Sequence, residues 1–210
     1  MLATIYLASR SPRRRELLRQ IGVGHELLLL REDAGRSVDI DETPHAGEAP
    51  REYALRVATT KAQKGIWAAG RRASCVIKPV LAADTTIALD GEVIGKPRDA
   101  ADAALILRRL AARSHTVITA VAVALALDKN ERARVETRVS ESQVTFGALS
   151  DDQIQCYITT GEPMDKAGAY AVQGRAAAFI TRIEGSYSGI MGLPLAETAE
   201  LLALFGIVTI

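Results

Sequence analysis

The sequence has few of the residues that build disulfide scaffolds, zinc centres or histidine catalytic sites. Among 210 residues there are two cysteines, Cys75 and Cys156, and they do not form a CxxC pair. This excludes a disulfide framework and a thiolate zinc cluster, and it fits a reducing cytosol. The histidines, His25, His45 and His115, stand far apart, so a histidine zinc site is not expected either.

An excess of one charge and long apolar runs are also lacking. The chain has 26 basic and 25 acidic residues, so no global field favours nucleic acid or a membrane surface. No apolar run reaches the ~20 residues that a membrane helix needs, and residues 1–7 lack the cationic start of a signal sequence. With 48% hydrophobic residues, we expect a single cytoplasmic domain over residues 1–210, without extensive nucleic-acid contact.

Familiar catalytic motifs are missing as well. There is no GxxxxGK[ST] phosphate loop and no GxGxxG after a strand. The run GSYSG at residues 185–189 is not a nucleophile elbow, because that motif has one residue on each side of its serine. What remains is a set of Lys, Arg, Asp and Glu at strand ends and in loops, which suits a polyanion and a hard divalent cation.

The strongest candidate site surrounds Asp84. The apolar run 80–83 predicts a buried strand that ends at Asp84 and is followed by two threonines. Residues 87–94 predict a tight hairpin, because their Asp-Gly pair suits a type I′ turn. The hairpin returns Lys96 towards Asp84, which gathers a carboxylate, hydroxyls and an ammonium suited to a metal ion and phosphate oxygens. Alternatively, Asp84 only caps a turn.

A second candidate site lies near the start of the chain. Residues 3–8 predict a buried strand, and Ser11 with the following proline predicts the start of a helix. Such a junction points free backbone N–H groups at an anion, which would also offset the arginines of the first turn. The alternative is a solvated basic helix face. The candidates for anion binding are Ser9, Arg13 and Arg14.

Residues 31–50 are polar and rich in Asp, Glu, Pro and Gly, which predicts a long lid or binding loop. In this loop Asp41 and Glu42 form an acidic wall or are ordinary solvated carboxylates. The helix expected at residues 52–69 carries Lys61 beside its apolar stripe. A lysine in that position commonly extends its ammonium into water, so a phosphate role for Lys61 needs independent support.

The remaining elements follow from hydrophobic alternation and from capping residues, which include Asp99 before the helix at 100–111 and a capping box of Ser150 with Gln153. They are a strand at 25–30, a helix at 100–111, strands of a long hairpin at 116–127 and 132–146 with their turn at 128–131, a helix at 150–159, a strand at 176–183, a loop at 185–192 and a final helix at 193–206. In the helix at 100–111, Leu105, Leu107 and Leu110 are expected to face the core.

Residues 165–174 are rich in glycine and alanine, and small side chains let a backbone approach a ligand closely. Within this segment Asp165 and Lys166 offer a charge pair, and Gln173 offers an amide with both a donor and an acceptor. Gln173 is therefore a candidate reader of a nucleobase edge.

Several separated motifs occur in order along the chain. They are LASRSPRRRELL at 7–18, ADT at 83–85, GKP at 95–97, TGEPMDKAGAY at 160–170 and GLPL at 192–195. Together they resemble the signature of the Maf family of nucleoside triphosphate pyrophosphatases. The resemblance spans nearly the whole chain, and an ordered set of motifs is far more specific than any one of them.

The resemblance implies an α/β fold of the inosine triphosphatase-like type, in which an elongated mixed β-sheet flanked by helices forms two lobes around a central cleft. It implies cleavage between the α and β phosphates with a divalent cation, Mg²⁺ or Mn²⁺. The DKAGAY run with Gln173 is similar to the branch that prefers dTTP and UTP. Mild departures are Ala171 in place of a usual glycine and Ile190-Met191 in place of valines.

The resemblance also implies roles for individual residues. Asp84 matches the family's catalytic acid, described as a proton acceptor, although the sequence leaves open whether it is chiefly a metal ligand. Positions tied to base choice are matched by Arg13, Thr85 and Gln173. Polar positions that line the cleft are matched by Glu42, Lys61, Lys96, Asp165 and Lys166. We expect phosphate contacts from Ser9, Arg14, Lys61, Lys96 and Lys166, and metal contacts from Asp84 and Glu42.

Other functions stay open at this point. One is hydrolysis of 7-methylguanosine triphosphate, and another is a non-catalytic nucleotide- or nucleic-acid-binding role in the control of cell division. The near-neutral charge argues against the second. Removal of modified nucleotides is a further role for a pyrophosphatase of this kind. A homodimer is the expected assembly, since it is the commonest state of soluble oligomers.

Overall fold

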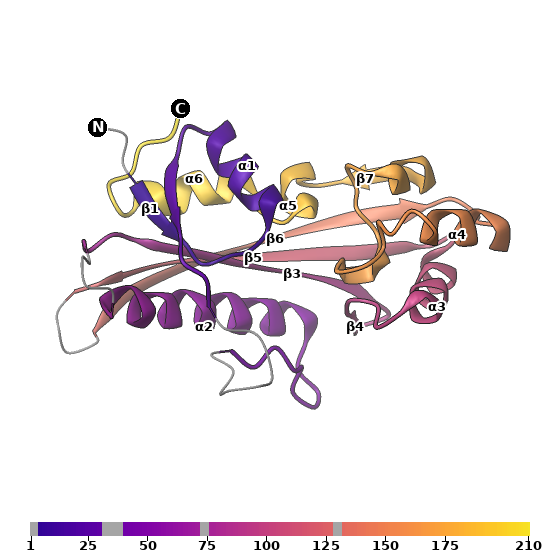
Figure 1. Cartoon of the computed structure of the whole chain (residues 1–210), viewed down its shortest axis with the longest axis horizontal. Helices are drawn as coiled ribbons and strands as arrows, with labels where there is room; N and C mark the ends of the chain where they lie inside the picture. The colour runs from indigo at the N-terminus through magenta and orange to yellow at the C-terminus, as the bar shows by residue number, and fades with distance from the viewer. Residues whose placement is uncertain (1–3, 31–39, 72–75, 128–131) are drawn as a thin grey trace.

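The computed structural model describes residues 4–30, 40–71, 76–127 and 132–210, and Figure 1 shows an elongated sheet with helices on both faces. The elements are β1 (Thr4–Leu7), α1 (Pro12–Gln20), β2 (Gly24–Leu27), α2 (Pro50–Gly70), β3 (Val80–Leu89), β4 (Glu92–Ile94), α3 (Ala100–Leu110), β5 (Ser114–Ala126), β6 (Ala133–Phe146), α4 (Asp151–Ile158), η1 (Ala167–Ala169), η2 (Arg175–Phe179), β7 (Ile180–Glu184), α5 (Tyr187–Met191) and α6 (Leu195–Ala203). Within the described ranges, no helix combines the length and apolarity needed to cross a membrane.

The strands form one mixed sheet, as the sequence predicts. Its order is β2-β1-β3-β5-β6-β7, and β4 pairs with β3 off this path. β1 runs parallel to β2 and β3, whereas the other pairs are antiparallel. Figure 1 shows β3, β5 and β6 running along the length of the molecule, with α1, α2 and α6 over one half and α3 and α4 at the other end. We call these halves the first and second lobe.

One edge of β3 is shared by two short strands. β1 pairs with its beginning, up to Leu7 opposite Leu81, and β4 pairs with its end, from Ile87 opposite Ile94. Between these pairs, no strand of the described chain lies against that edge of β3 at residues 82–86. Asp84 lies in the middle of this unpaired stretch, at the junction of the lobes.

The expectation that a strand ends at Asp84 is wrong. β3 continues to Leu89, because β5 pairs with it without interruption from Val80 to Ala88. The following hairpin is confirmed, since Asp90 and Gly91 both have positive φ, 53° and 81°. Because side chains alternate along a strand, Asp84 and Thr85 point to opposite faces of the sheet.

Helix α2 lies close to the sheet because its buried face is built from small residues. Ala54, Ala58 and Ala62 are fully buried and belong to the same apolar cluster as Val80 and the sheet alanines. At Gly65 a methyl group would lie 2.6 Å from Cγ1 of Val80, so only glycine fits there. This close approach brings the side chains of α2 within reach of β3.

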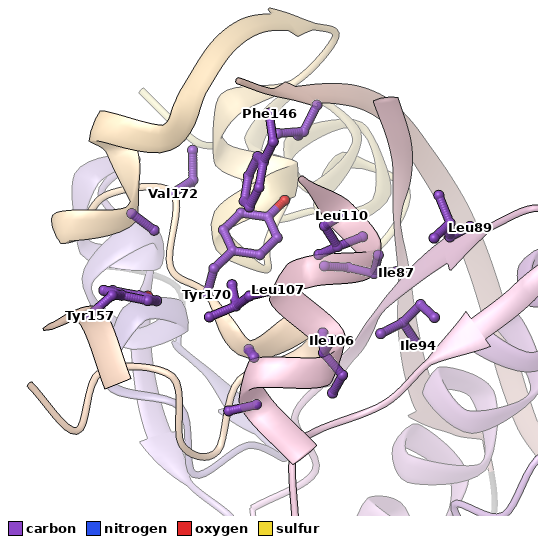
Figure 2. Packing of buried hydrophobic residues seen from close by; sticks show 14 of the residues in the cluster. Ile87, Leu89, Ile94, Ile106, Leu107, Leu110, Phe146, Tyr157, Tyr170 and Val172 are labelled. Carbon is purple, nitrogen blue, oxygen red and sulfur yellow. The ribbon is translucent and has the colours of Figure 1, made fainter. Parts of the chain in front are cut away.

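The second lobe has its own hydrophobic core, shown in Figure 2. Leu107 and Leu110 of α3 pack there with Ile87 of β3. Phe146 and Tyr170 meet edge to face, with ring centroids 4.9 Å apart. Because Tyr170 is anchored in this core, the small-residue segment that precedes it is held in one place.

Most predicted elements are confirmed, including the Asp99 cap of α3 and the Ser150 capping box of α4. The long hairpin is also confirmed, although its turn at 128–131 lies outside the described residues, as do Cys75 and residues 31–39. Leu105 is an exception, since 57% of its surface is exposed while its neighbours face the core.

Three boundaries were wrong. The strand expected at 25–30 is shorter, because its pairing with β1 ends at Leu27. The strand expected at 176–183 begins later, because residues 175–179 form the 3₁₀ helix η2 and β7 starts at Ile180. The loop expected at 185–192 contains helix α5. The hydroxyl of Ser186 accepts from the N–H of Gly189 and starts α5, a cap that the sequence reading overlooked.

His115 gives the second lobe a predictable sensitivity to acid. It is 2% exposed, its Nε2 lies 2.8 Å from the Tyr170 hydroxyl, and its Nδ1 is buried without a hydrogen-bond partner among the residues that the structure describes. Burial lowers the pKa of His115 from 6.5 to about 4. As the pH falls below 6.5, His115 therefore binds a proton in the unfolded chain but stays neutral in the folded protein. The free energy of unfolding decreases as a result.

We expect His115→Gln, which cannot titrate, to reduce the loss of unfolding free energy between pH 7 and pH 5 by roughly 2 kcal/mol, at about 1.4 kcal/mol per pH unit below 6.5. Urea unfolding at both pH values measures this difference. His25→Gln is the matched control, since its imidazole lies outside this core. An equal pH dependence in His115→Gln and the wild type would contradict the prediction.

Candidate active site

A buried charge cluster forms at the unpaired stretch of β3, on the face covered by α2. The Nζ of Lys61 lies 2.9 Å from Oδ1 of Asp84 and 2.6 Å from Oε1 of Glu42. Lys61 and Asp84 are 8% and 7% exposed. The alternative in which Lys61 reaches into water is therefore wrong, because the small-residue face of α2 brings its ammonium between two carboxylates.

The charges of this cluster stabilise one another. Burial acts to lower the pKa of Lys61, but Asp84 and Glu42 outweigh it and the pKa lies above the usual 10.5. Burial acts to raise the pKa of Glu42, but Lys61, helped by Lys96 and Arg14, brings it below the usual 4.5. At neutral pH the Lys61–Glu42 ion pair is therefore fully charged.

Helix α2 also fixes the backbone around Glu42. The Tyr53 hydroxyl donates to the carbonyl of Glu42 at 2.9 Å, and Arg56 donates to the carbonyl of Thr43 at 3.0 Å. Glu42 thus forms a wall of the cluster. Asp41 does not, because its Oδ1 accepts from the N–H of Thr43 at 2.8 Å in a local turn. The predicted acidic wall is therefore made by one of its two members.

Arg14 organises the other face of β3. Its guanidinium donates from Nε to the carbonyl of Gly192 at 2.7 Å, from Nη1 to Oγ of Ser9 at 3.2 Å and from Nη2 to Oγ1 of Thr85 at 3.2 Å. Ser11 caps α1 as predicted. Arg14 thus joins the β1–α1 junction, β3 and the segment after α5.

A further set of cations comes from three separate segments. Arg13 donates to the carbonyl of Met191 at 3.3 Å, and Lys166 donates to the carbonyl of Met164 at 3.2 Å. Burial, followed by the charge of Arg13 and a smaller contribution from Lys96, lowers the pKa of Lys166. These groups are near enough to repel one another, and such a set is stabilised when an anion binds between them.

Backbone geometry places Lys96 and Lys166 together. The N–H of Gly168 donates to the carbonyl of Gly95 at 3.0 Å, which ties the two lysine segments to each other. Gly168 has a φ of 67°, and a methyl group there would lie 2.3 Å from Cδ1 of Ile87. Asp165, which is exposed, also has positive φ, 62°, a conformation that costs energy in a residue other than glycine.

Gln173 is exposed, and within the described chain its amide makes no hydrogen bond to protein. Glu162 holds the neighbouring backbone. Its carboxylate accepts from the Tyr157 hydroxyl and from the N–H of Arg175, each at 3.0 Å. A methyl group at Gly174 would lie 2.2 Å from this carboxylate, so the contact requires glycine.

Glu162 was quoted in a motif but not selected as a site residue. Its position just before a glycine-rich segment could have indicated its role. From there its carboxylate accepts hydrogen bonds from the backbone N–H groups of Arg175 and Ala176, on the far side of the loop. Ala171, which stands where the family pattern usually has glycine, does not need the backbone freedom of glycine. Among the described residues other than glycine, positive φ occurs at other positions, so Ala171 is not strained.

Neither of two cavities found in the described chain outlines a nucleotide. A cavity of about 10 Å³ is lined by Ser9 and Lys61, among others. A larger groove of about 330 Å³ lies beyond the start of α2, and none of the predicted site residues lines it. The site is therefore defined by its converging charged groups rather than by an enclosed pocket.

A metal ion would depend on few protein ligands. In the described ranges, no group of three or more His, Cys, Asp or Glu side chains is arranged to hold one. Asp84 and Glu42 fit Mg²⁺ or Mn²⁺ none the less, since such ions are commonly bound by one or two carboxylates together with substrate phosphates. The Lys61 ammonium lies between these carboxylates and shows that the place attracts a cation.

Comparison with known proteins gives a consistent result. The sequence profile described as "Maf-like protein" matches residues 4–205. A protein of Aromatoleum aromaticum named dTTP/UTP pyrophosphatase is 57% identical, over 97% of this chain and 96% of that relative. Proteins with the same name are 53% identical in Ralstonia nicotianae, over 95% and 92% of the two chains, and 49% identical in Nitrosomonas europaea, over 97% and 95%.

Proposed function

The chain belongs to the Maf-like protein family, and from this premise we propose that it hydrolyses dTTP and UTP to the nucleoside monophosphate and pyrophosphate. The observation that carries the proposal is the meeting of two groups of charges at the junction of the lobes. Asp84, held by Lys61, lies on β3, and the repelling cations Arg13, Lys96 and Lys166 gather around the same junction. This combination suits a triphosphate and a water nucleophile.

Asp84 is the base in this proposal. Lys61 contacts its Oδ1, whereas Oδ2 accepts no hydrogen bond from the described residues and, in this proposal, receives the proton of the water. Asp84 takes a proton from a water molecule as the water oxygen bonds to the α-phosphorus. The anhydride P–O bond breaks, and pyrophosphate leaves with the bonding electrons.

The cations bind the triphosphate. Lys96 and Lys166 contact its phosphate oxygens and offset the charge that develops on the leaving pyrophosphate. Arg14 and Ser9 contribute mainly by fixing the β1–α1 junction, because their side chains are hydrogen-bonded to each other and to β3. Asp165 limits the net positive charge beside Lys166.

Asp84 and Glu42 would hold the divalent cation together with substrate oxygens. A bound Mg²⁺ or Mn²⁺ supplies Lewis-acid polarisation of a phosphate and neutralises its charge. Lys61 then sets the spacing of the two carboxylates by contacting both of them.

The test is release of pyrophosphate from dTTP, UTP, CTP and 7-methylguanosine triphosphate, with and without Mg²⁺ or Mn²⁺. We expect metal-dependent release that is fastest with dTTP and UTP. Fastest release from 7-methylguanosine triphosphate would replace the proposed substrate. No release by folded protein would replace the proposed reaction with a binding function.

Gln173→Ala should change the order of substrate preference without loss of stability. Because the amide is exposed and makes no hydrogen bond to the described part of the protein, its removal should leave the packing intact. We expect the ratio of kcat/KM for UTP over CTP to fall roughly tenfold, the scale of one lost contact that distinguishes substrates. Gln155→Ala, on an exposed face of α4, is the control. An unchanged ratio would remove Gln173 as a base reader.

Residues 1–210 are proposed to act as one such domain, in the cytoplasm and as a homodimer. Analytical ultracentrifugation tests the assembly, and a monomer at micromolar concentration would contradict it. Removal of modified nucleotides is a compatible role, which a panel of modified uridine triphosphates would reveal.

A further inference from the structure

Thr119 is a buried threonine of β5 to which the sequence analysis gave no role. It is 1% exposed and is the register partner of Thr85, so their side chains lie side by side on the same face of the sheet. Its Oγ1 donates to the carbonyl of Gly189 at 2.8 Å and lies 2.9 Å from Oγ1 of Thr85. The two hydroxyls therefore form one row of hydrogen bonds that ends at the Gly189 carbonyl of α5.

The direction of the hydrogen bonds in this row follows from counting hydroxyl protons. A threonine hydroxyl has one proton, and a carbonyl oxygen only accepts. Because the proton of Thr119 goes to Gly189, the proton between the two threonines has to come from Thr85. Arg14 donates to the same oxygen of Thr85 at 3.2 Å. Thr85 has thus used its only proton, so towards a ligand its hydroxyl can only accept a hydrogen bond.

The Gly189 carbonyl, which is the last acceptor in this row of hydrogen bonds, is held rigidly. Gly189 lies in α5, where its N–H donates to the Ser186 hydroxyl at 3.0 Å. Gly192, with a φ of 115°, packs against Thr85 and Arg14, since a methyl group there would lie 3.5 Å from Oγ1 of Thr85 and 3.6 Å from Nε of Arg14. The arrangement therefore leaves the Thr85 hydroxyl little freedom to turn its proton outward.

We propose that Thr119 is a positioning residue that keeps the Thr85 hydroxyl an acceptor, and that this polarity selects the N3–H of a uracil or thymine base. The inference rests on the proposed function and on the resemblance that ties Thr85 to base choice. The edge of these bases presents an acceptor, a donor and an acceptor, so its complement is a donor, an acceptor and a donor. Thr85 would supply the central acceptor, and Arg13 and the amide N–H of Gln173 are the donors that the resemblance ties to base choice.

The same polarity disfavours cytosine. Its N3 has no proton, so its lone pair would face the lone pair of the Thr85 oxygen. Leaving such polar groups unpaired is a strong source of discrimination between substrates of equal size. Selectivity would then come from the orientation of a hydroxyl proton that Thr119 fixes from outside the contact with substrate.

The first experiment compares UTP, N3-methyl-UTP and CTP as substrates of the wild-type protein, with pyrophosphate release as the readout. We expect kcat/KM to be at least roughly tenfold lower for N3-methyl-UTP and CTP than for UTP. Equal values for UTP and N3-methyl-UTP would overturn the inference alone. No release from UTP at all would overturn the proposed function together with it.

The second experiment uses Thr119→Val, which keeps the shape and removes the hydroxyl. Thr85 can then turn its proton towards the ligand, so the UTP to CTP ratio should fall roughly tenfold, and Thr119→Ser should restore it. Thr198→Val is the matched control, because its buried hydroxyl donates to a backbone carbonyl within α6 at 2.6 Å. An equal loss with UTP and CTP in Thr119→Val would show a structural role only and overturn the inference.

Discussion

Asp84→Asn should lower kcat for dTTP and UTP by roughly two or more orders of magnitude, the scale of losing a general base or a metal ligand. The fold should persist, because an Asn Oδ1 still accepts the hydrogen bond from Lys61 that Asp84 accepts at 2.9 Å. Pyrophosphate release at saturating nucleotide measures the effect. Asp90→Asn is the control, since Asp90 is exposed on the same hairpin and pairs with Arg113 at 2.6 Å.

The variant also separates the two roles of Asp84. If it is chiefly a base, kcat should fall in Asp84→Asn while the metal concentration for half-maximal activity stays the same. If it is chiefly a metal ligand, that concentration should rise, as it should in Glu42→Gln. Near-normal turnover of Asp84→Asn would remove this residue from the reaction.

Lys61→Met should destabilise the protein by about 3–5 kcal/mol, the cost of breaking a buried ion pair by removing one partner. Methionine replaces the volume of the side chain but leaves the carboxylate of Asp84 buried without its counter-charge. Lys64→Met, on an exposed position of the same helix, should change stability little. Urea unfolding of both variants measures the difference, and equal midpoints would contradict the prediction.

The pH dependence of this difference follows from the shifted pKa values. The pKa of Glu42 is lowered, so its contribution is present above 4.5 and is lost as the pH falls through its folded value. The pKa of Lys61 is raised, so its contribution is present below 10.5 and is lost as the pH rises through its folded value. The unfolding free energy of the wild type should therefore exceed that of Lys61→Met by the largest amount between pH 4.5 and pH 10.5.

The sequence was sufficient for most helices because their caps are local, as at Ser11 and Ser150. It also selected Asp84 as a candidate site residue, but it joined this residue with Thr85 in one cluster. The period of the strand puts them on opposite faces, where Asp84 meets Lys61 and Thr85 meets Arg14. That division was available from the sequence once residues 80–89 were taken as one strand.

Other features could not be obtained from the sequence, because they depend on pairs that are distant in the chain. β1 and β4 share one edge of β3, and only this pairing leaves the stretch at 82–86 open. The burial of Lys61 likewise depends on how closely α2 approaches the sheet, which the contact at Gly65 sets. Thr119 gained its role from its register opposite Thr85.

The two long strands that join the lobes determine how the molecule can deform. β5 has 13 residues and β6 has 14, and they stay paired from Ser114 opposite Thr145 to Ala126 opposite Ala133. Swinging one lobe against the other would bend this ladder and strain many hydrogen bonds at once. The spacing between Asp84, the proposed base on β3, and the cations around it should therefore be mechanically stiff, and we expect nucleotide exchange by side-chain rearrangement rather than by a hinge between the lobes.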